Sequence, residues 1–274
     1  MSAHGVPLCI NDLWRAAAAR LDSAGVDAPT NTARLLLAHV LGKSKAWVAA
    51  HGSDVLSPQQ AQALREFDRL LNRLIAREPL FYVLGEREFY GLSMRVTPDV
   101  LIPRPETEML VELSLDTLKG LSPLPSPAVV DIGTGSGAVA IAVAYNQPQA
   151  HVIATDVSLP ALRVAQENAV RHQVQDRVQF VQIDLLSAFS TLPPVITANL
   201  PYVAREEVDA LPPEIRCYEP RVALDGGYDG IELIRRLLKQ VTDLLARCNS
   251  SRHGCHIFLE IGASQGSAVL HAAQ

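Results

Sequence analysis

Residues 128–146 read AVVDIGTGSGAVAIAVAYN, which is a short β-branched segment, a glycine-rich turn and a long apolar segment in direct succession. Gly133, Gly135 and Gly137 let the backbone turn sharply and come close to a ligand. The segment after the turn has helical length, and the first turn of a helix offers free N–H groups to a ligand. The stretch therefore predicts a strand, a ligand-binding turn and a helix, with a merely tight structural turn as the alternative.

Strand-like and helix-like segments alternate from this stretch onward. Further strands are expected at HVIATD (151–156), RVQFVQID (177–184), VITANL (195–200) and HIFLEIG (256–262), and a helix from Gly230 to about Arg247. Short apolar strands separated by amphipathic helices are typical of a parallel sheet that helices cover on both faces. The predicted fold class is therefore α/β.

The chain before this region has a different pattern. Apolar residues such as Phe67, Leu71 and Leu74 recur at spacings of three and four, which predicts helices. The following text, LFYVLGEREFYGLSMRVTPDV, alternates and carries Gly85 and Gly91, which suits a hairpin. The predicted organisation is a small all-α domain over 1–79, a connecting β-hairpin over 80–100 and the α/β domain over 101–274. The alternative is that the early helices only extend the main core.

Composition limits the class of protein. The chain has 274 residues, of which 48% are hydrophobic and 19% charged, so it is neither a disulfide miniprotein nor a disordered tail. Its longest strictly apolar run, Ala138 to Tyr145, is less than half of the roughly 20 residues that a membrane-spanning helix needs, and the start MSAHGVPLCI has no signal pattern. We therefore expect a cytoplasmic protein that does not bind membranes.

Charge and cysteine usage point the same way. A net charge of −5 gives no general attraction to phosphate backbones, so we expect no direct binding of nucleic acid. The four cysteines are scattered, which suits reduced thiols. Cys248, His253, Cys255 and His256 lie close together, but their spacing is not that of paired zinc ligands, and we expect no metal site.

Acidic residues stand at the ends of three successive predicted strands. Asp131 precedes the glycine turn, Asp156 ends the next strand and can accept the hydroxyl protons of a ribose, and Asp184 ends the third. A single such aspartate is more often a cap or a turn former. The three together resemble the S-adenosylmethionine site of a class I methyltransferase.

The residues Asn199-Leu200-Pro201-Tyr202 follow the fourth predicted strand. They resemble the Asn/Asp-x-Pro-aromatic signature of methyltransferases that act on planar amide or amino nitrogens. The Asn199 side-chain oxygen and the Leu200 carbonyl can accept from both N–H bonds of such a nitrogen, and Tyr202 can pack on the planar group. Pro201 biases Leu200 toward an extended backbone. The alternative is an Asn-x-Pro turn with a tyrosine in the core.

With these motifs in place, the chain from about Trp14 onward resembles the protein-(glutamine-N5) methyltransferases of peptide chain release factors, the PrmC/HemK type. The resemblance rests on the early helices and on the segments PLFYVLGEREFYG, LIPRPETE (101–108), DIGTGSG, NLPY, YEPRVALDGGYDG (218–230) and LEIG (259–262).

The resemblance implies a class I, Rossmann-like fold, S-adenosylmethionine as methyl donor and, as substrate, the glutamine of the Gly-Gly-Gln tripeptide of release factors. It implies that the helical domain recognises the substrate and that the enzyme is a monomer acting in translation termination. By position, the donor would contact Gly133, Thr134, Gly135, Ser136, Gly137, Asp156 and Asn199, with Asp184 and Leu185 near the adenine. Asn199, Leu200, Pro201 and Tyr202 would hold the glutamine amide.

Two features depart from the family pattern. Leu200 stands where bacterial members mostly have proline, so we expect a less rigid turn with the same reaction. The resemblance also calls for two more strands after HIFLEIG, so we expect the sheet to lack its C-terminal strands. The alternatives are a methyltransferase for a ribosomal-protein glutamine or a nucleobase amine, and a protein that binds the donor without turnover. Glu106 and Glu108 could order the loop around the donor or cap the next helix.

Overall fold

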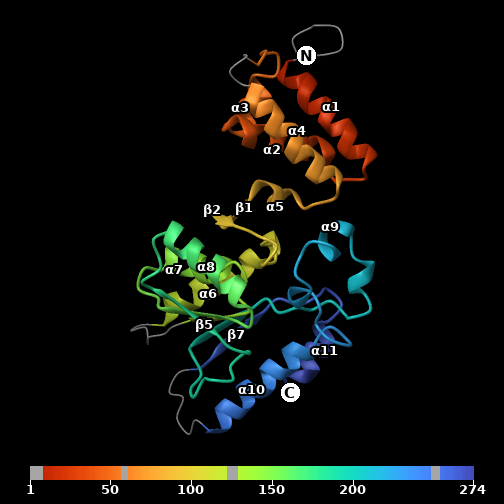
Figure 1. The fold of residues 1–274 in the computed structure, drawn as a ribbon. Helices are drawn as coiled ribbons and strands as arrows, with labels where there is room; N and C mark the ends of the chain where they lie inside the picture. Colours follow the sequence, from red (N-terminus) through yellow and green to blue (C-terminus); the bar gives the residue numbers. More distant parts are fainter. Residues whose placement is uncertain (1–8, 57–60, 122–128, 248–253) are drawn as a thin grey trace. The chain divides into compact units, whose positions relative to one another are not determined.

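The computed structural model describes residues 9–56, 61–121, 129–247 and 254–274 (Figure 1). The chain divides into two compact units, Met1–Gly85 and Glu86–Gln274. Each unit has its own hydrophobic core. The units are described separately below.

The first unit is helical. Its helices are α1 (Ile10–Ser23), α2 (Pro29–Leu41), α3 (Lys45–Ala50), α4 (Ala61–Ile75) and α5 (Leu80–Leu84). Their buried faces form one cluster, in which Leu21, Leu36 and Leu71 are almost fully buried. The three-and-four spacing that predicted these helices is thus the spacing of residues that share this core.

Helix α5 corrects the expected extent of the hairpin, which began at residue 80. Residues 80–84 are helical because Val83 is buried in the core of the first unit, with Leu80 and Leu84 packed against it. Gly85 then ends the helix with a φ of +78°, in the left-handed region that favours glycine. The hairpin itself starts only at Glu86.

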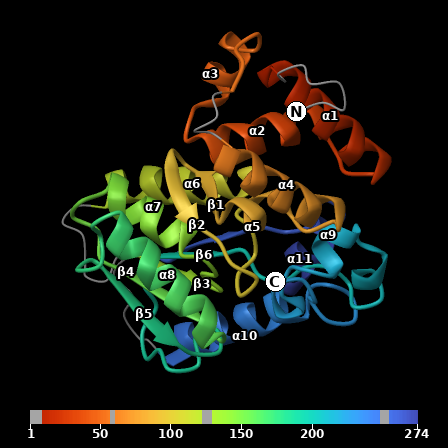
Figure 2. The same cartoon turned by 45° about the horizontal axis from the view of Figure 1, so that its top comes forward.

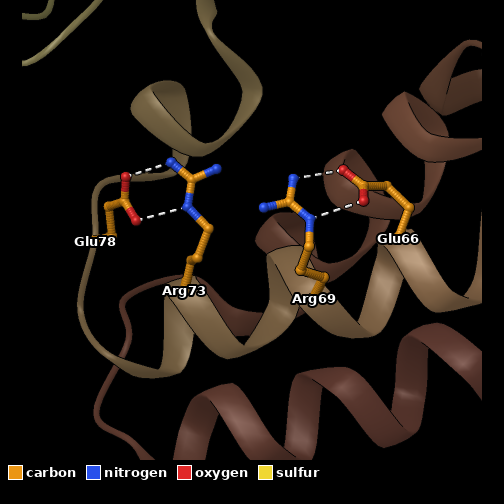
Figure 3. Close-up of polar contacts among 4 residues, drawn as sticks. All are labelled: Glu66, Arg69, Arg73 and Glu78. Carbon is orange, nitrogen blue, oxygen red and sulfur yellow. Dashed lines mark hydrogen bonds and ion pairs between the residues drawn. The ribbon is translucent and has the colours of Figure 1, made fainter.

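Two bidentate ion pairs lie along α4 (Figure 3). Arg69 donates from Nε and Nη2 to Glu66 at 2.8 and 2.7 Å, within one turn of the helix. Arg73 donates from Nε to Glu78 at 2.7 Å, across the turn that leads to α5. The Arg69 pair is exposed and contributes little, whereas the partly buried Arg73 pair fixes the α4–α5 turn.

The second unit contains a parallel sheet in the order β5-β4-β3-β6-β7. Figure 2 labels β3, β4, β5 and β6 of this sheet. Its strands are β3 (Val129–Ile132), β4 (Val152–Asp156), β5 (Val178–Gln182), β6 (Val195–Ala198) and β7 (His256–Leu259). The helices are α6 (Glu108–Gly120), α7 (Ala138–Asn146), α8 (Leu159–Arg171), α9 (Pro213–Arg216), α10 (Glu232–Arg247) and α11 (Gly266–Ala272), and the 3₁₀ turns are η2 (Pro105–Thr107), η3 (Val208–Ala210) and η4 (Arg221–Ala223).

Helices cover both faces of this sheet. Val129 and Val195 belong to the cluster that α6, α7 and α8 complete, whereas their neighbours Val130 and Ile196 belong to the cluster that α10 completes. Neighbouring residues of a strand point to opposite faces, so both faces need apolar side chains. The predicted α/β fold with helices on both faces is confirmed.

An antiparallel hairpin, β1 (Glu86–Phe89) and β2 (Leu92–Arg95), precedes the sheet. It is bound to α8 through the fully buried Asn168, whose Oδ1 accepts from the Arg95 N–H at 2.7 Å. Asn168 Nδ2 donates to the carbonyls of Arg95 at 3.0 Å and of Ser136 at 2.9 Å. One side chain thus connects the hairpin, α8 and the glycine-rich turn.

None of the described helices is long and apolar enough to span a membrane.

Candidate functional site

A cavity of about 450 Å³ lies at the carboxyl ends of the parallel strands, where folds of this kind bind ligands. Its walls come from the loop before α6, the glycine-rich turn, the ends of β4, β5 and β6, the η4 segment and the first part of α10. The lining residues include Arg104, Thr107, 131–136, 156–158, 183–185, 199–201, Val222 and Arg236. Most of the site residues predicted from the sequence therefore line this one cavity, whereas Gly137 and Tyr202 do not.

The glycine-rich turn is held open toward this cavity. Gly135 has a φ of +55°, and no atom lies within 4 Å of the place that a Cβ would take. Asp156 accepts from the Gly135 N–H at 2.9 Å and from the Ser158 N–H at 2.8 Å. Asp156 therefore shapes the turn and also lines the cavity.

Gly137 has a packing role. Its φ is +82°, and a Cβ on it would lie 2.8 Å from Cδ1 of Ile141 and 3.0 Å from Cβ of Ala165. The residue therefore allows α7 to start directly against α8. Its contribution to ligand binding is indirect, through the placement of the helix that follows the turn.

Asp131 is a buried carboxylate beneath the turn. Its Oδ2 accepts from the Thr134 hydroxyl at 2.6 Å and its Oδ1 from the Thr197 hydroxyl at 2.8 Å. Burial raises the pKa of Asp131 to about 6, although these hydrogen bonds act in the opposite direction. Burial also raises the pKa of Asp156, so the cavity floor holds two aspartates whose ionisation a cationic ligand would favour.

The raised pKa predicts a pH dependence of stability. The folded protein binds a proton at Asp131 more tightly than the unfolded chain, where the pKa is about 4, so this residue's contribution to the free energy of unfolding falls as the pH rises from about 4 to about 6. In Asp131→Asn this titration is absent. Urea unfolding should therefore show the variant gaining about 2 kcal/mol on the wild type between pH 4 and pH 7. Parallel curves for the two proteins would contradict the assignment.

Asp184 and Leu185 follow β5 at the cavity wall. The Asp184 carboxylate forms an ion pair with Arg236 of α10, which also lines the cavity and which the sequence did not suggest. Leu185 is buried with a φ of +51°, an unfavourable conformation for a residue with a Cβ. The strain is compensated by packing of Leu185 in the core between the sheet and α10.

The Asn199–Tyr202 segment lines the cavity with Asn199, Leu200 and Pro201. Asn199 lines the cavity and donates from Nδ2 to the Thr107 hydroxyl at 3.0 Å. Leu200 is buried, and its Cδ2 lies 3.3 Å from where a Cβ on Gly133 would be. Tyr202 is half-buried, outside the cavity lining, and burial raises the pKa of its hydroxyl. Asn199 is therefore the residue of this motif that lines the cavity with a polar side chain.

The glycines of the 226–230 loop allow that loop to pack against this motif. A Cβ on Gly226 would lie 2.6 Å from the Pro201 carbonyl oxygen, and one on Gly230 would lie 2.4 Å from the Tyr202 carbonyl oxygen. Gln265 also donates to the Tyr202 carbonyl, at 2.8 Å. The backbone after Asn199 is therefore fixed by close contacts that only glycine permits.

Arg104 and Glu219 join the two loops that flank the cavity. Arg104 Nη2 donates to Glu219 Oε1 at 2.7 Å, and the Glu219 side chain is only 2% exposed. Burial raises the pKa of Glu219, and Arg104 opposes this shift. The Glu219 Oε2 atom has no hydrogen-bond partner among the described residues. The ion pair with Arg104 thus supplies most of the stabilisation of the buried Glu219 charge.

Removal of Arg104 should therefore destabilise the protein. We expect Arg104→Met to lower the free energy of unfolding by about 2 kcal/mol, less than for a fully buried pair because Arg104 is partly exposed. The double variant Arg104→Met/Glu219→Leu should recover part of the loss, since no charge is then buried alone. Urea titrations of the three proteins measure both effects. Equal stability of the single and the double variant would contradict this account.

Glu260 is the residue of this region that sequence reasoning missed. It directly follows β7, and its N–H donates to the Ala198 carbonyl at 3.0 Å, which places it beside Asn199. Burial raises the pKa of Glu260, and Glu106 adds to the shift, while the Thr107 hydroxyl and the Asn199 amide oppose it. The only signal in the sequence was its place in the LEIG segment, to which no role was given.

The two glutamates of the loop before α6 behave differently from the expectation. Glu108 neither caps its helix nor lines the cavity; its Oε1 accepts from the Tyr90 N–H of the hairpin at 2.9 Å. Glu106 is exposed.

Among the residues that the structure describes, no group of histidine, cysteine and acidic side chains could hold a metal. Cys248 and His253 lie outside the described residues.

The cavity suits a cationic ligand with a large, partly apolar body. Asp131 and Asp156 supply negative charge near the turn, whereas Arg104 and Arg236 are each paired with a carboxylate. The open space over Gly135 leaves room for a close approach to backbone N–H groups. Asn199 then offers one amide at the cavity wall for a second, polar group.

Two known families match this chain. The PrmC N-terminal domain matches residues 12–85, and the Methyltransferase small domain matches residues 109–211. The first match ends at Gly85, which is also the last residue of the helical unit. The second covers the glycine-rich turn and Asn199–Tyr202.

Individual relatives extend the similarity over most of the chain. A release factor glutamine methyltransferase of Cereibacter sphaeroides is 40% identical over 94% of this chain and 87% of its own length. The MTRF1L release factor glutamine methyltransferase of Homo sapiens is 36% identical over 88% of this chain and 72% of its own. The solved hMettl16 catalytic domain, in complex with an RNA hairpin, has a TM-score of 0.53 with 18% identity, covers 71% of this chain and 69% of its own, and supports the fold alone.

Proposed function

The chain belongs to the release factor glutamine methyltransferases, and from this we propose that its cavity holds the methyl donor and a glutamine side chain of a release factor together. The protein is an S-adenosylmethionine-dependent enzyme that methylates glutamine in release factors. The observation that carries the proposal is that Asn199 and the glycine-rich turn line one cavity.

The residues of the cavity fit the donor. We assign the backbone of Gly133–Gly135, the carboxylates of Asp131 and Asp156, and the wall formed by Asp184 and Leu185 to its binding. S-adenosylmethionine supplies, when bound, a methyl group on a positively charged sulfur. Asp131 and Asp156 favour a cation in this space. Arg104 and Arg236 are each paired with a carboxylate, so neither brings an unpaired positive charge to the cavity.

Asn199 is assigned to the glutamine amide. An amide nitrogen is a weak nucleophile because its lone pair is delocalised, so orientation is the main help that the protein can give. The Asn199 side-chain oxygen accepts one N–H, and the Leu200 carbonyl accepts the other. The close packing of Gly226 and Gly230 on the next two residues keeps that backbone in place. Tyr202 is proposed to support this segment from outside the cavity wall.

The leaving proton needs no strong base. Acceptors on both N–H bonds increase the electron density on nitrogen as the carbon–sulfur bond breaks and the carbon–nitrogen bond forms. The methylated nitrogen is then strongly acidic and releases one N–H proton to solvent. Apolar walls exclude water during the transfer; these include Leu200 and Val139, which are almost fully buried.

The target glutamine is proposed to be that of the Gly-Gly-Gln tripeptide, and the helical unit Met1–Gly85 to contribute to recognition of the release factor. The net charge of −5 gives no general attraction to nucleic acid, so protein alone is the proposed substrate. Since release factors act on ribosomes, the proposed place of action is the cytoplasm.

A methyl-transfer assay tests this function. The purified full chain is incubated with S-adenosylmethionine and a release factor that carries either Gln or Ala in the tripeptide. Mass spectrometry should find one added methyl group on the tripeptide of the Gln protein and none on the Ala protein. Methylation of a ribosomal protein or of RNA, with the release factor left unmodified, would overturn the proposal, as would donor binding without any transfer.

A further inference from the structure

The end of β7 places a carboxylate beside Asn199. Strands β6 and β7 run parallel with Ala198 opposite Leu259, and the next residues along the two strands are Asn199 and Glu260. The bond from the Glu260 N–H to the Ala198 carbonyl continues this register by one residue. Thr107, from the last turn of η2, completes the group, and its side chain is buried.

The hydrogen bonds in this group have a defined direction. An ionised carboxylate can only accept, whereas a threonine hydroxyl has one proton to donate and lone pairs to accept. The Asn199 Nδ2 donates to the Thr107 oxygen at 3.0 Å. The Thr107 hydroxyl, the Asn199 amide and the Tyr202 hydroxyl all face the Glu260 carboxylate and influence it electrostatically. Because the Thr107 oxygen accepts from Asn199, we infer that the Thr107 proton is directed at the acceptor-only Glu260 carboxylate.

This direction fixes the Asn199 amide. The opposite orientation would bring the Asn199 oxygen against the Thr107 oxygen and toward the Glu260 carboxylate, so that acceptors would face one another. The planar amide holds Nδ2 and Oδ1 on different sides of Cγ, and engagement of Nδ2 therefore leaves Oδ1 for an incoming N–H. Asn199 and Thr107 both line the cavity, whereas Glu260 lies behind them.

We propose that Glu260 and Thr107 are positioning residues that keep the Asn199 carbonyl oxygen available to the substrate, so that the site selects a glutamine amide over a glutamate carboxylate. The inference rests on the proposed function. A glutamine amide donates two N–H bonds to acceptors, whereas a glutamate would bring oxygen lone pairs against the Asn199 oxygen. Selection of glutamine thus depends on Glu260, which does not itself touch the substrate. The Glu260 Oε2 atom is buried and has no hydrogen-bond partner among the described residues.

Three variants test this chain. Glu260→Gln gives Thr107 a donor as neighbour, which frees its hydroxyl to donate to Asn199 and permits the reversed amide. Thr107→Val removes the hydroxyl at nearly constant volume, and Thr107→Ser keeps it. We expect kcat on the release factor to fall about tenfold in the first two and to stay within about threefold of wild type in Thr107→Ser. Donor affinity, measured by calorimetry, should stay within about threefold in all of them.

Binding selectivity supplies a readout that a merely structural role would not change. Release factors carrying Gln or Glu in the tripeptide compete for the enzyme, and their ratio of dissociation constants is measured. In Glu260→Gln the preference for Gln should fall by about tenfold. Thr32→Val is the matched control, since Thr32 is also a buried threonine with a side-chain hydrogen bond but lies in α2 of the helical unit. Its selectivity should equal that of the wild type.

The outcomes separate the two proposals. If the wild type methylates its release factor and Glu260→Gln and Thr107→Val keep both rate and selectivity, the inference is overturned and the function stands. If the wild type does not methylate or bind the release factor, the function is overturned and the inference with it. Loss of rate together with loss of selectivity, with rescue in Thr107→Ser, supports the inference.

Discussion

Replacement of Asn199 by alanine is expected to lower kcat by on the order of a hundredfold to a thousandfold. Asn199 is the residue of its motif that lines the cavity with a polar side chain, and its amide donates to the Thr107 hydroxyl at 3.0 Å. Alanine removes the acceptor that orients the glutamine amide, so the loss is expected in the transfer step. Donor affinity should fall by only about fivefold, the value of about one hydrogen bond.

Single-turnover kinetics and donor calorimetry separate these two effects. Asn199→Asp keeps an acceptor oxygen and should retain more activity than the alanine variant, although its charge lies close to Glu260. Asn146→Ala is the control, since Asn146 is exposed and donates only to the Ala142 carbonyl of its own helix. An Asn199→Ala enzyme whose kcat stays within about tenfold of wild type would contradict the assigned role.

The second large effect is expected from Asn168→Ala. This residue is fully buried and makes three hydrogen bonds, two to the backbone of Arg95 and one to the Ser136 carbonyl. Alanine leaves these backbone groups without a partner and leaves a cavity in the core. We expect the free energy of unfolding to fall by about 3 kcal/mol, measured by urea titration.

This substitution should also weaken donor binding, because the Ser136 carbonyl belongs to the glycine-rich turn. A loss of about tenfold in donor affinity is expected at temperatures where the variant remains folded. Asn146→Ala, which lacks such partners, should change neither quantity. A variant as stable as the wild type would show that Asn168 does not hold the hairpin and the turn together.

The fold was predictable because its signals are local. A β-branched segment, three glycines and an apolar segment follow one another in residues 128–146, and each selects its structure over a few residues. The exception is α5. Residues 80–84, LFYVL, form a short apolar run that does not by itself distinguish a helix from a strand, and in the structure Val83 is buried in the core of the first unit. Tertiary packing overrides local preference in so short a segment.

The site was predictable to the extent that its residues stand at strand ends. Asp131 and Asp156 lie near or at the carboxyl ends of β3 and β4, Asn199 directly follows β6, and the carboxyl ends of parallel strands meet at one edge. Arg236 lies in a helix and gave no such signal, whereas Glu260 also follows a strand, β7, but was given no role. Each reaches the cavity region through a neighbour distant in sequence, Asp184 for Arg236 and Asn199 for Glu260.

The sequence by itself determined the order of strands and helices, the glycine turn and the amide-binding motif, because these depend on backbone conformation and on periodicity along the chain. Only the tertiary structure decided which charges are paired and which way hydrogen bonds run. The Arg104–Glu219 pair and the Glu260–Thr107–Asn199 chain both join loops that are far apart in sequence. The direction of a buried hydrogen bond and the pairing of a buried charge depend on all neighbours in space. These neighbours come together only in the folded protein.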